Sequence, residues 1–175
     1  MKKSYQFILV MLLFAIASRF LLIPNFTAIG AIALLSGGLM KNKILAILSP
    51  LTILVISDMI LNTFIYHMDS LLYVGALYVY VPILLITIMS NYVKNLNVSK
   101  YIGLSLISTI IFFLVSNFGV WQTGFMYPHN IGGLLACYIA AIPFALSYLT
   151  STLIYGGVIS LVGKRFELYQ TLAYK

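Results

Sequence analysis

The chain has 175 residues, and only 7% of them are charged, ten Lys or Arg against three Asp or Glu, while 62% are hydrophobic. A soluble domain is roughly 25% charged, so this composition argues against most soluble enzymes and excludes an intrinsically disordered chain. Cys137 is the only cysteine, which excludes a disulfide scaffold, a zinc finger and an iron–sulfur centre. We therefore expect an integral membrane protein.

Six apolar runs predict an all-α, polytopic membrane protein with a single domain over residues 1–175, because a helix crosses a bilayer with about 20 apolar residues. The first run covers residues 5–23. The second, residues 26–40, is short and contains several glycines, which favour close packing against neighbouring helices. The third run covers residues 44–64, and the fourth covers residues 71–89.

The fifth expected span covers residues 98–118. The last apolar stretch, residues 131–163, is too long for one straight span, so we divide it near Pro143. The division predicts an external loop or short helix within residues 119–142 and a sixth span over residues 143–162.

The basic residues predict the orientation of these spans. With six spans, nine of the ten Lys and Arg residues fall on one side of the membrane: Lys2, Lys3, Lys41, Lys43, Lys94, Lys100, Lys164, Arg165 and Lys175. By the positive-inside rule, both termini are cytoplasmic, and we expect a multi-pass protein of the bacterial cytoplasmic (inner) membrane. We expect no nucleic-acid partner, because the basic residues are spread over short loops.

Two charged residues lie inside expected spans. Arg19 and Asp58 are about four and about six residues from the outer ends of the first and third spans, so they fall at similar depths. An unpaired charge there costs about 2.5–3.5 kcal/mol on insertion scales, and pairing removes that cost. Two interpretations stay open: a structural ion pair, or residues that line a substrate cavity.

The outer loops carry aromatic, amide and imidazole side chains, which are suitable for a small-molecule pocket. The longest loop, residues 117–130, contains the single tryptophan. The alternative is a belt of aromatic side chains at the depth of the lipid headgroups. The candidate substrate-binding residues are Asn25, His67, Asn117, Trp121, Tyr127 and His129.

Metal and hydrolytic chemistry are poorly supported. Two histidines with Asp69 make a weak metal site, so we expect no metal and no cofactor, with Cys137 as a remote candidate for a cobalt ligand. An intramembrane metalloprotease needs a histidine–glutamate cluster, but the only glutamate is Glu167 in the C-terminal tail. We expect no catalytic residues and no enzyme.

Several segments resemble the substrate-binding (S) components of energy-coupling-factor (ECF) vitamin transporters, and an uncharacterised bacterial integral-membrane family close to them. These segments are Asn25-Phe26-Thr27-Ala28-Ile29, Ser57-Asp58, Asn117-Phe118-Gly119-Val120-Trp121, Tyr127-Pro128 and Ala141-Ile142-Pro143-Phe144. The resemblance implies an S-component-like bundle that captures a vitamin-like micronutrient, cobalamin included, on the outer face. It also implies an energising transmembrane subunit with two ATPases.

One feature departs from that family. S components often carry an Ala-x-x-x-Ala face on the first span for the energising partner, whereas Ala15 is followed four residues later by Arg19. Solitary or coupled transport therefore stays open, since solitary S-like transporters, cobalamin-type ones included, are similar in lacking this face. A different class of function also stays open, a non-catalytic structural or assembly subunit of a larger membrane complex, because the chain is small, lacks catalytic groups and has small-residue helix faces. That alternative predicts outer loops that are packed solid, without a cavity.

Overall fold

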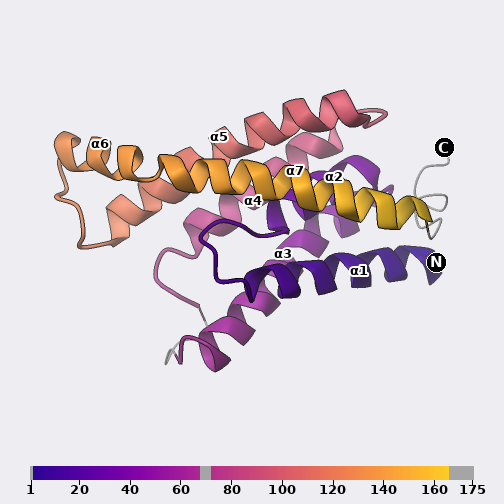
Figure 1. The fold of residues 1–175 in the computed structure, drawn as a ribbon, viewed down its shortest axis with the longest axis horizontal. Coiled ribbons are helices and arrows are strands. Elements are labelled where there is room, and N and C mark those ends of the chain that lie inside the picture. The colour runs from indigo at the N-terminus through magenta and orange to yellow at the C-terminus, as the bar shows by residue number, and fades with distance from the viewer. Residues whose placement is uncertain (1, 68–71, 166–175) are drawn as a thin grey trace.

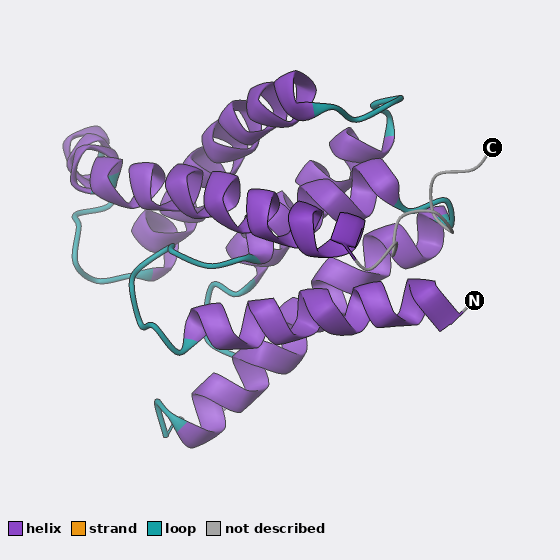
Figure 2. Cartoon of the chain, turned by 45° about the vertical axis from the view of Figure 1, so that its right-hand side comes forward, coloured by secondary structure: helices purple, strands orange, loops and turns teal. Residues whose placement is uncertain are grey.

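The computed structural model describes residues 2–67 and 72–165, and this part of the chain is helical with no strand (Figures 1 and 2). The expected all-α class is therefore confirmed. Within the described ranges the helices are α1 (Lys2–Arg19), α2 (Ile29–Leu39), α3 (Lys43–Phe64), α4 (Leu77–Asn91), α5 (Val98–Thr123), α6 (Ile131–Ala140) and α7 (Ile142–Arg165).

Three of these helices, α3, α5 and α7, are long and apolar enough to cross a membrane. Many large apolar side chains on the outside of the bundle are exposed, among them Leu13, Leu106 and Leu161. An exposed apolar surface of this extent is unfavourable in water and favourable in lipid. These features indicate a membrane protein.

Helix α1 ends at Arg19, before the expected end of the first span at Ile23. Leu22 and Asn25 have φ values of 53° and 57°, and this left-handed conformation cannot continue a right-handed helix. Residues 20–28 form a loop instead. Arg19 is consequently the last residue of α1 and lies directly before this loop.

Helix α2 is a short helix in the middle of the bundle. It has 11 residues, which corresponds to a length of about 16 Å, roughly half the thickness of a bilayer core. Residues 29–37 are all buried or nearly so, and α2 contacts α1, α3, α4, α5 and α7. The expected second span, residues 26–40, is therefore longer than the helix that forms.

Small and hydroxyl-bearing residues allow α2 to lie close to its neighbours. A Cβ atom on Gly30 would lie 2.5 Å from Thr152 Oγ1 and 2.7 Å from Tyr148 Oη, both of α7. On the α4 side, Ser90 Oγ donates a hydrogen bond of 2.6 Å to the Leu34 carbonyl. The small-residue face of this segment is thus used within the bundle.

Helix α4 begins later than expected, and α5 ends later. Leu71, the expected start of the fourth span, is outside the described residues, as is Asp69. Residues 74–76 form a turn before α4, and Gly75 in this turn has a φ of 95°. Helix α5 extends to Thr123, beyond the expected end at residue 118.

Helix α6 is a short helix within the expected external segment, and Asn130 Oδ1 caps its start by accepting from Gly133 N at 2.8 Å.

The start of α1 and the end of α7 lie at the same end of the molecule (Figure 1). The α4–α5 connection lies at this end as well, whereas α6 and the loops 20–28 and 124–130 lie toward the opposite end. This second end, called the loop end below, contains the cavities described next.

Candidate functional site

A polar network at the loop end joins α1, α3 and α4. Arg19 Nη2 forms an ion pair with Asp58 Oδ1, and Arg19 Nη1 donates a hydrogen bond of 2.7 Å to Ser57 Oγ. The Tyr80 hydroxyl donates to the other carboxylate oxygen, Asp58 Oδ2, at 2.7 Å. The side chain of Asp58 is 3% exposed and that of Arg19 is 19% exposed. Both oxygens of the buried carboxylate thus have a partner, and Arg19 also borders open space.

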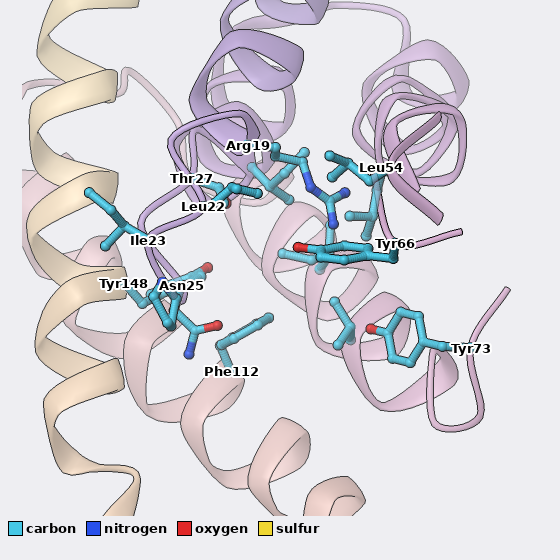
Figure 3. Close-up of a pocket in the computed structure, with 15 residues that line it drawn as sticks. Arg19, Leu22, Ile23, Asn25, Thr27, Leu54, Tyr66, Tyr73, Phe112 and Tyr148 are labelled. Atoms are coloured by element: carbon cyan, nitrogen blue, oxygen red, sulfur yellow. The ribbon is translucent and has the colours of Figure 1, made fainter. Parts of the chain in front are cut away.

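The open space beside Arg19 is a cavity of about 370 Å³, called the Arg19 cavity below. In Figure 3, Arg19, Tyr66 and Tyr73 lie on one side of it, and Asn25 and Tyr148 lie on the other. It is lined by Arg19, Leu22, Ile23, Pro24, Asn25, Thr27, Ile29, Leu54, Leu61, Tyr66, Tyr73, Val79, Ile83, Phe112 and Tyr148. Its volume is within the range of about 300–1,000 Å³ that is usual for ligand pockets.

A second cavity of about 390 Å³ adjoins the first and is called the α6 cavity below. It is lined by Pro24, Asn25, Tyr73, Val74, Gly75, Val79, Phe112, Ser116, Asn117, Gly119, Val120, Thr123, Met126, Tyr127, Cys137, Ala140, Ala141 and Phe144. Five of these residues also line the Arg19 cavity: Pro24, Asn25, Tyr73, Val79 and Phe112. The two cavities therefore share a wall made from the 20–28 loop, the residues that precede α4, and α4 and α5 themselves.

Three of the six residues expected to bind substrate line these cavities. Asn25 lines both, and Asn117 and Tyr127 line the α6 cavity. The left-handed backbone of Asn25 is one that asparagine adopts more readily than most residues, which explains why an amide residue occurs at this bend.

The other three residues lie elsewhere. The rings of Trp121 and His129 contact each other, with centroids 5.4 Å apart, and Trp121 Nε1 donates to the Pro128 carbonyl at 2.9 Å. His67 is exposed in the loop that follows α3. None of these three residues lines either cavity. Trp121 of α5 instead contacts the 124–130 loop through His129 and Pro128.

Cys137 lies on the wall of the α6 cavity and is 2% exposed. Its thiol donates to the Asn117 carbonyl at 3.5 Å. Within the described ranges, no three His, Cys, Asp or Glu side chains are grouped so that they could hold a metal ion. A cobalt-binding role for Cys137 would thus depend on this one thiol.

Sequence reasoning missed four aromatic residues of the Arg19 cavity: Tyr66, Tyr73, Phe112 and Tyr148. The rings of Phe112 and Tyr148 are stacked at 4.5 Å with an interplanar angle of 10°. These two residues occur inside long apolar runs, where composition does not distinguish a side chain that faces a cavity from one that faces lipid. Tyr66 is next to His67 in the sequence, and this proximity was the one available signal.

A family model described as a family of unknown function, DUF6580, matches residues 1–171. No curated protein and no solved structure matches the chain.

Proposed function

We propose that this chain, which belongs to the DUF6580 family of unknown function, is a membrane-embedded subunit that binds a small micronutrient at the extracytoplasmic face for uptake. The observation that carries the proposal is the Arg19 cavity, which combines one guanidinium with tyrosine hydroxyls and an amide on a largely apolar wall. Ligand pockets are built in this way, with few polar groups on an apolar surface.

The proposal includes six membrane crossings with both termini in the cytoplasm of a bacterial cell. Exposed lysines support this orientation, because Lys94 is in the α4–α5 connection, Lys100 is at the start of α5 and Lys164 is at the end of α7, and these parts lie at the end of the molecule opposite α6 (Figure 1). The positive-inside rule places such connections in the cytoplasm. The cavities then open toward the outside, where a scarce nutrient is encountered.

The 20–28 loop gives separate support. Because α2 is about half as long as a bilayer core is thick, the loop that precedes it lies at membrane depth. Non-helical backbone at that depth is tolerated where it lines a cavity, and Leu22, Asn25 and Thr27 of this loop line the Arg19 cavity. An irregular segment that lines a cavity is typical of a binding site in a transport protein.

The size of the cavity favours a compact ligand. At about 370 Å³, it is near the lower end of the range for ligand pockets, which fits a small vitamin or precursor better than a corrinoid macrocycle such as cobalamin. The alternative function, a structural subunit, predicts loops that are packed solid. Two cavities at the loop end favour the binding function.

An energising partner would contact the outside of the bundle. On α1, Met11 and Ala15 are fully buried, whereas Leu9 and Leu13 are exposed. A partner subunit at α1 would therefore contact leucines and not the alanine face found in S components. Co-purification of a second transmembrane subunit with ATPases would identify coupled transport.

The binding function is tested on the protein purified into lipid nanodiscs. We expect native mass spectrometry to find a retained small molecule, and a panel of vitamins and their precursors to include one that raises the thermal stability. A ligand present at 100 times its Kd stabilises by about 2.7 kcal/mol. If no molecule is retained and no compound changes the stability, the proposed function is wrong.

A matched pair of variants locates the site. Tyr66 follows α3, is 56% exposed and lines the Arg19 cavity. Tyr92 follows α4, is 78% exposed and lines neither cavity. Because both side chains are exposed, replacing either with leucine leaves the core intact. We expect Tyr66→Leu to weaken ligand binding about tenfold, the effect of about 1.4 kcal/mol, and Tyr92→Leu to leave it unchanged.

A further inference from the structure

The two adjoining cavities differ in the chemistry of their walls. Four polar side chains of the α6 cavity are already bonded to main-chain carbonyls: Ser116 Oγ to Phe112 O at 2.6 Å, Asn117 Nδ2 to Phe113 O at 2.8 Å, Thr123 Oγ1 to Gly119 O at 2.8 Å, and Cys137 Sγ to Asn117 O at 3.5 Å. These donors are therefore directed back into the helices. The remaining wall is mostly apolar, with Val74, Val79, Phe112, Val120, Met126, Ala140, Ala141 and Phe144, and it also contains Asn25, Tyr73 and Tyr127.

The Arg19 cavity, in contrast, contains a cationic donor. A guanidinium has five N–H donors, and the structure pairs Arg19 through Nη1 with Ser57 and through Nη2 with Asp58. Asp58 itself does not line the cavity. Among the described residues, Arg19 is the one Lys, Arg, Asp or Glu that lines either cavity. A ligand in the Arg19 cavity therefore lies against a cationic side chain and no carboxylate, which favours a head group with acceptor oxygens.

The two cavities adjoin, because five residues line both of them. Asn25, Tyr73 and Phe112 lie at this junction, and they come from three different segments of the chain. The combined space remains within the usual size range for ligand pockets. From the Arg19 cavity to the α6 cavity, the lining thus becomes more apolar and no longer contains a cationic side chain.

The α6 cavity is covered by a segment that is apolar on its outside as well. Phe125, Met126, Ile131 and Ile139 are strongly exposed, and the sequence has no Lys, Arg, Asp or Glu between Lys100 and Lys164. This segment accordingly has no charged group with which to bind a second polar end of a ligand.

We propose that the ligand is a small amphiphile, whose oxygen-bearing head group is bound by Arg19 and whose apolar tail fills the cavity beneath α6. This inference rests on the proposed binding function and defines the class of substrate. It predicts that affinity depends on the length of the tail as well as on the head group.

The test uses unbranched carboxylic acids of four to twelve carbons as probes, with the protein in nanodiscs and equilibrium dialysis as the measurement. Empty nanodiscs are subtracted, because longer acids also enter the lipid. We expect the Kd to fall about fourfold for each added methylene, the transfer free energy of a buried CH₂, until the cavity is full. For one chain length, the acid and the primary amide should bind more than tenfold tighter than the amine, which lacks an acceptor oxygen.

A pair of alanines on α6 provides the matched variants. Ala140 is exposed and lines the α6 cavity, whereas Ala136, one turn earlier and also exposed, lines neither cavity. We expect Ala140→Leu to shorten the best-binding acid by about three carbons, the number that leucine adds, and Ala136→Leu to leave the series unchanged.

The outcomes separate the two proposals. The amphiphile would be overturned, and the binding function retained, if a polar vitamin bound equally well to the protein and to the Ala140→Leu variant while the affinity for the acids did not depend on their length. Binding of neither the acids nor any compound of the vitamin panel would overturn both. Chain-length dependence that is the same in both leucine variants would show that the tails are in lipid and would also overturn the amphiphile.

Discussion

At the scale of single residues, the ion pair between Arg19 and Asp58 joins the end of α1 to the middle of the bundle. Asp58 accepts from two directions, from Arg19 and from Tyr80, so it contributes to packing between α1, α3 and α4. Arg19 also lines a cavity. The sequence leaves two interpretations open, a structural ion pair and residues that line a cavity. They are compatible, because Arg19 forms the ion pair and also lines the cavity.

Removing one partner of this pair should destabilise the protein. We expect Arg19→Gln to lower the free energy of unfolding by about 3 kcal/mol, because a buried carboxylate then loses its cationic partner. The double variant Arg19→Gln with Asp58→Asn should recover more than half of this loss, since no unpaired charge remains. Thermal unfolding in detergent, followed by size-exclusion chromatography, measures both effects.

An exposed lysine provides the control for that experiment. Lys43 is exposed at the start of α3, and Lys43→Gln should change the stability by less than about 0.5 kcal/mol. Additive losses in the Arg19 and Asp58 double variant would show that the two residues are not coupled.

At the scale of helices, α2 depends on glycines and hydroxyl groups for its place in the bundle. Gly30→Ala would put a methyl group 2.5 Å from Thr152 Oγ1 and 2.7 Å from Tyr148 Oη, and overpacking of this kind costs about 1–3 kcal/mol. We expect a loss of that size in the free energy of unfolding, measured by thermal unfolding in detergent.

Gly103 of α5 is the matched control. A Cβ atom there meets nothing within 4 Å, and alanine is favoured over glycine in a helix by about 1 kcal/mol. Gly103→Ala should therefore be neutral or stabilising. Equal destabilisation by both variants would indicate a general intolerance of these helices to alanine, not a steric clash at Gly30.

The helices could be predicted from the sequence to the extent that apolar composition reflects them. For α3, the predicted and observed bounds differ by one residue at the start, Lys43 in place of Ile44. The end of α1 and the start of α2 could not be predicted, because Leu22 and Ile23 continue an apolar run while the backbone at Leu22 is left-handed. Apolar residues favour burial but do not specify whether lipid or protein surrounds them.

The site was predictable in its region and only partly in its residues. Asn25, Asn117 and Tyr127, three of the residues predicted to bind substrate, line the cavities. Trp121 and His129 contact each other instead, and this pairing depends on how the 124–130 loop folds back on α5. Phe112 and Tyr148 occupy the site from within spans, where only the three-dimensional packing shows which face of a helix is turned inward.

At the scale of the whole molecule, the proposed topology places the two ends of the bundle on opposite sides of the membrane. Cys137 is the single cysteine, so a Cys137→Ser background permits one new cysteine at a time. Phe125 of the 124–130 loop and Tyr92 of the α4–α5 connection are both strongly exposed, and these two connections lie at opposite ends of the molecule (Figure 1). We expect a membrane-impermeant maleimide to label Phe125→Cys on intact cells, and to label Tyr92→Cys only after the cells are permeabilised.

The reverse pattern of labelling would invert the topology and place the cavities on the cytoplasmic side. Labelling of both cysteines on intact cells would contradict the expected number of crossings between them. The Cys137→Ser protein without an added cysteine has no thiol, and it gives the background level of maleimide labelling.

The central position of α2 has a consequence for how the protein is made. Residues near the N-terminus form a helix whose neighbours include α4, α5 and α7, all of which leave the ribosome later. During synthesis, α2 therefore has to wait in the lipid or in the insertion machinery with its glycine and serine faces uncovered. Assembly is completed only when the last helix arrives, so a chain that stops before α7 would display an unfinished core to membrane proteases.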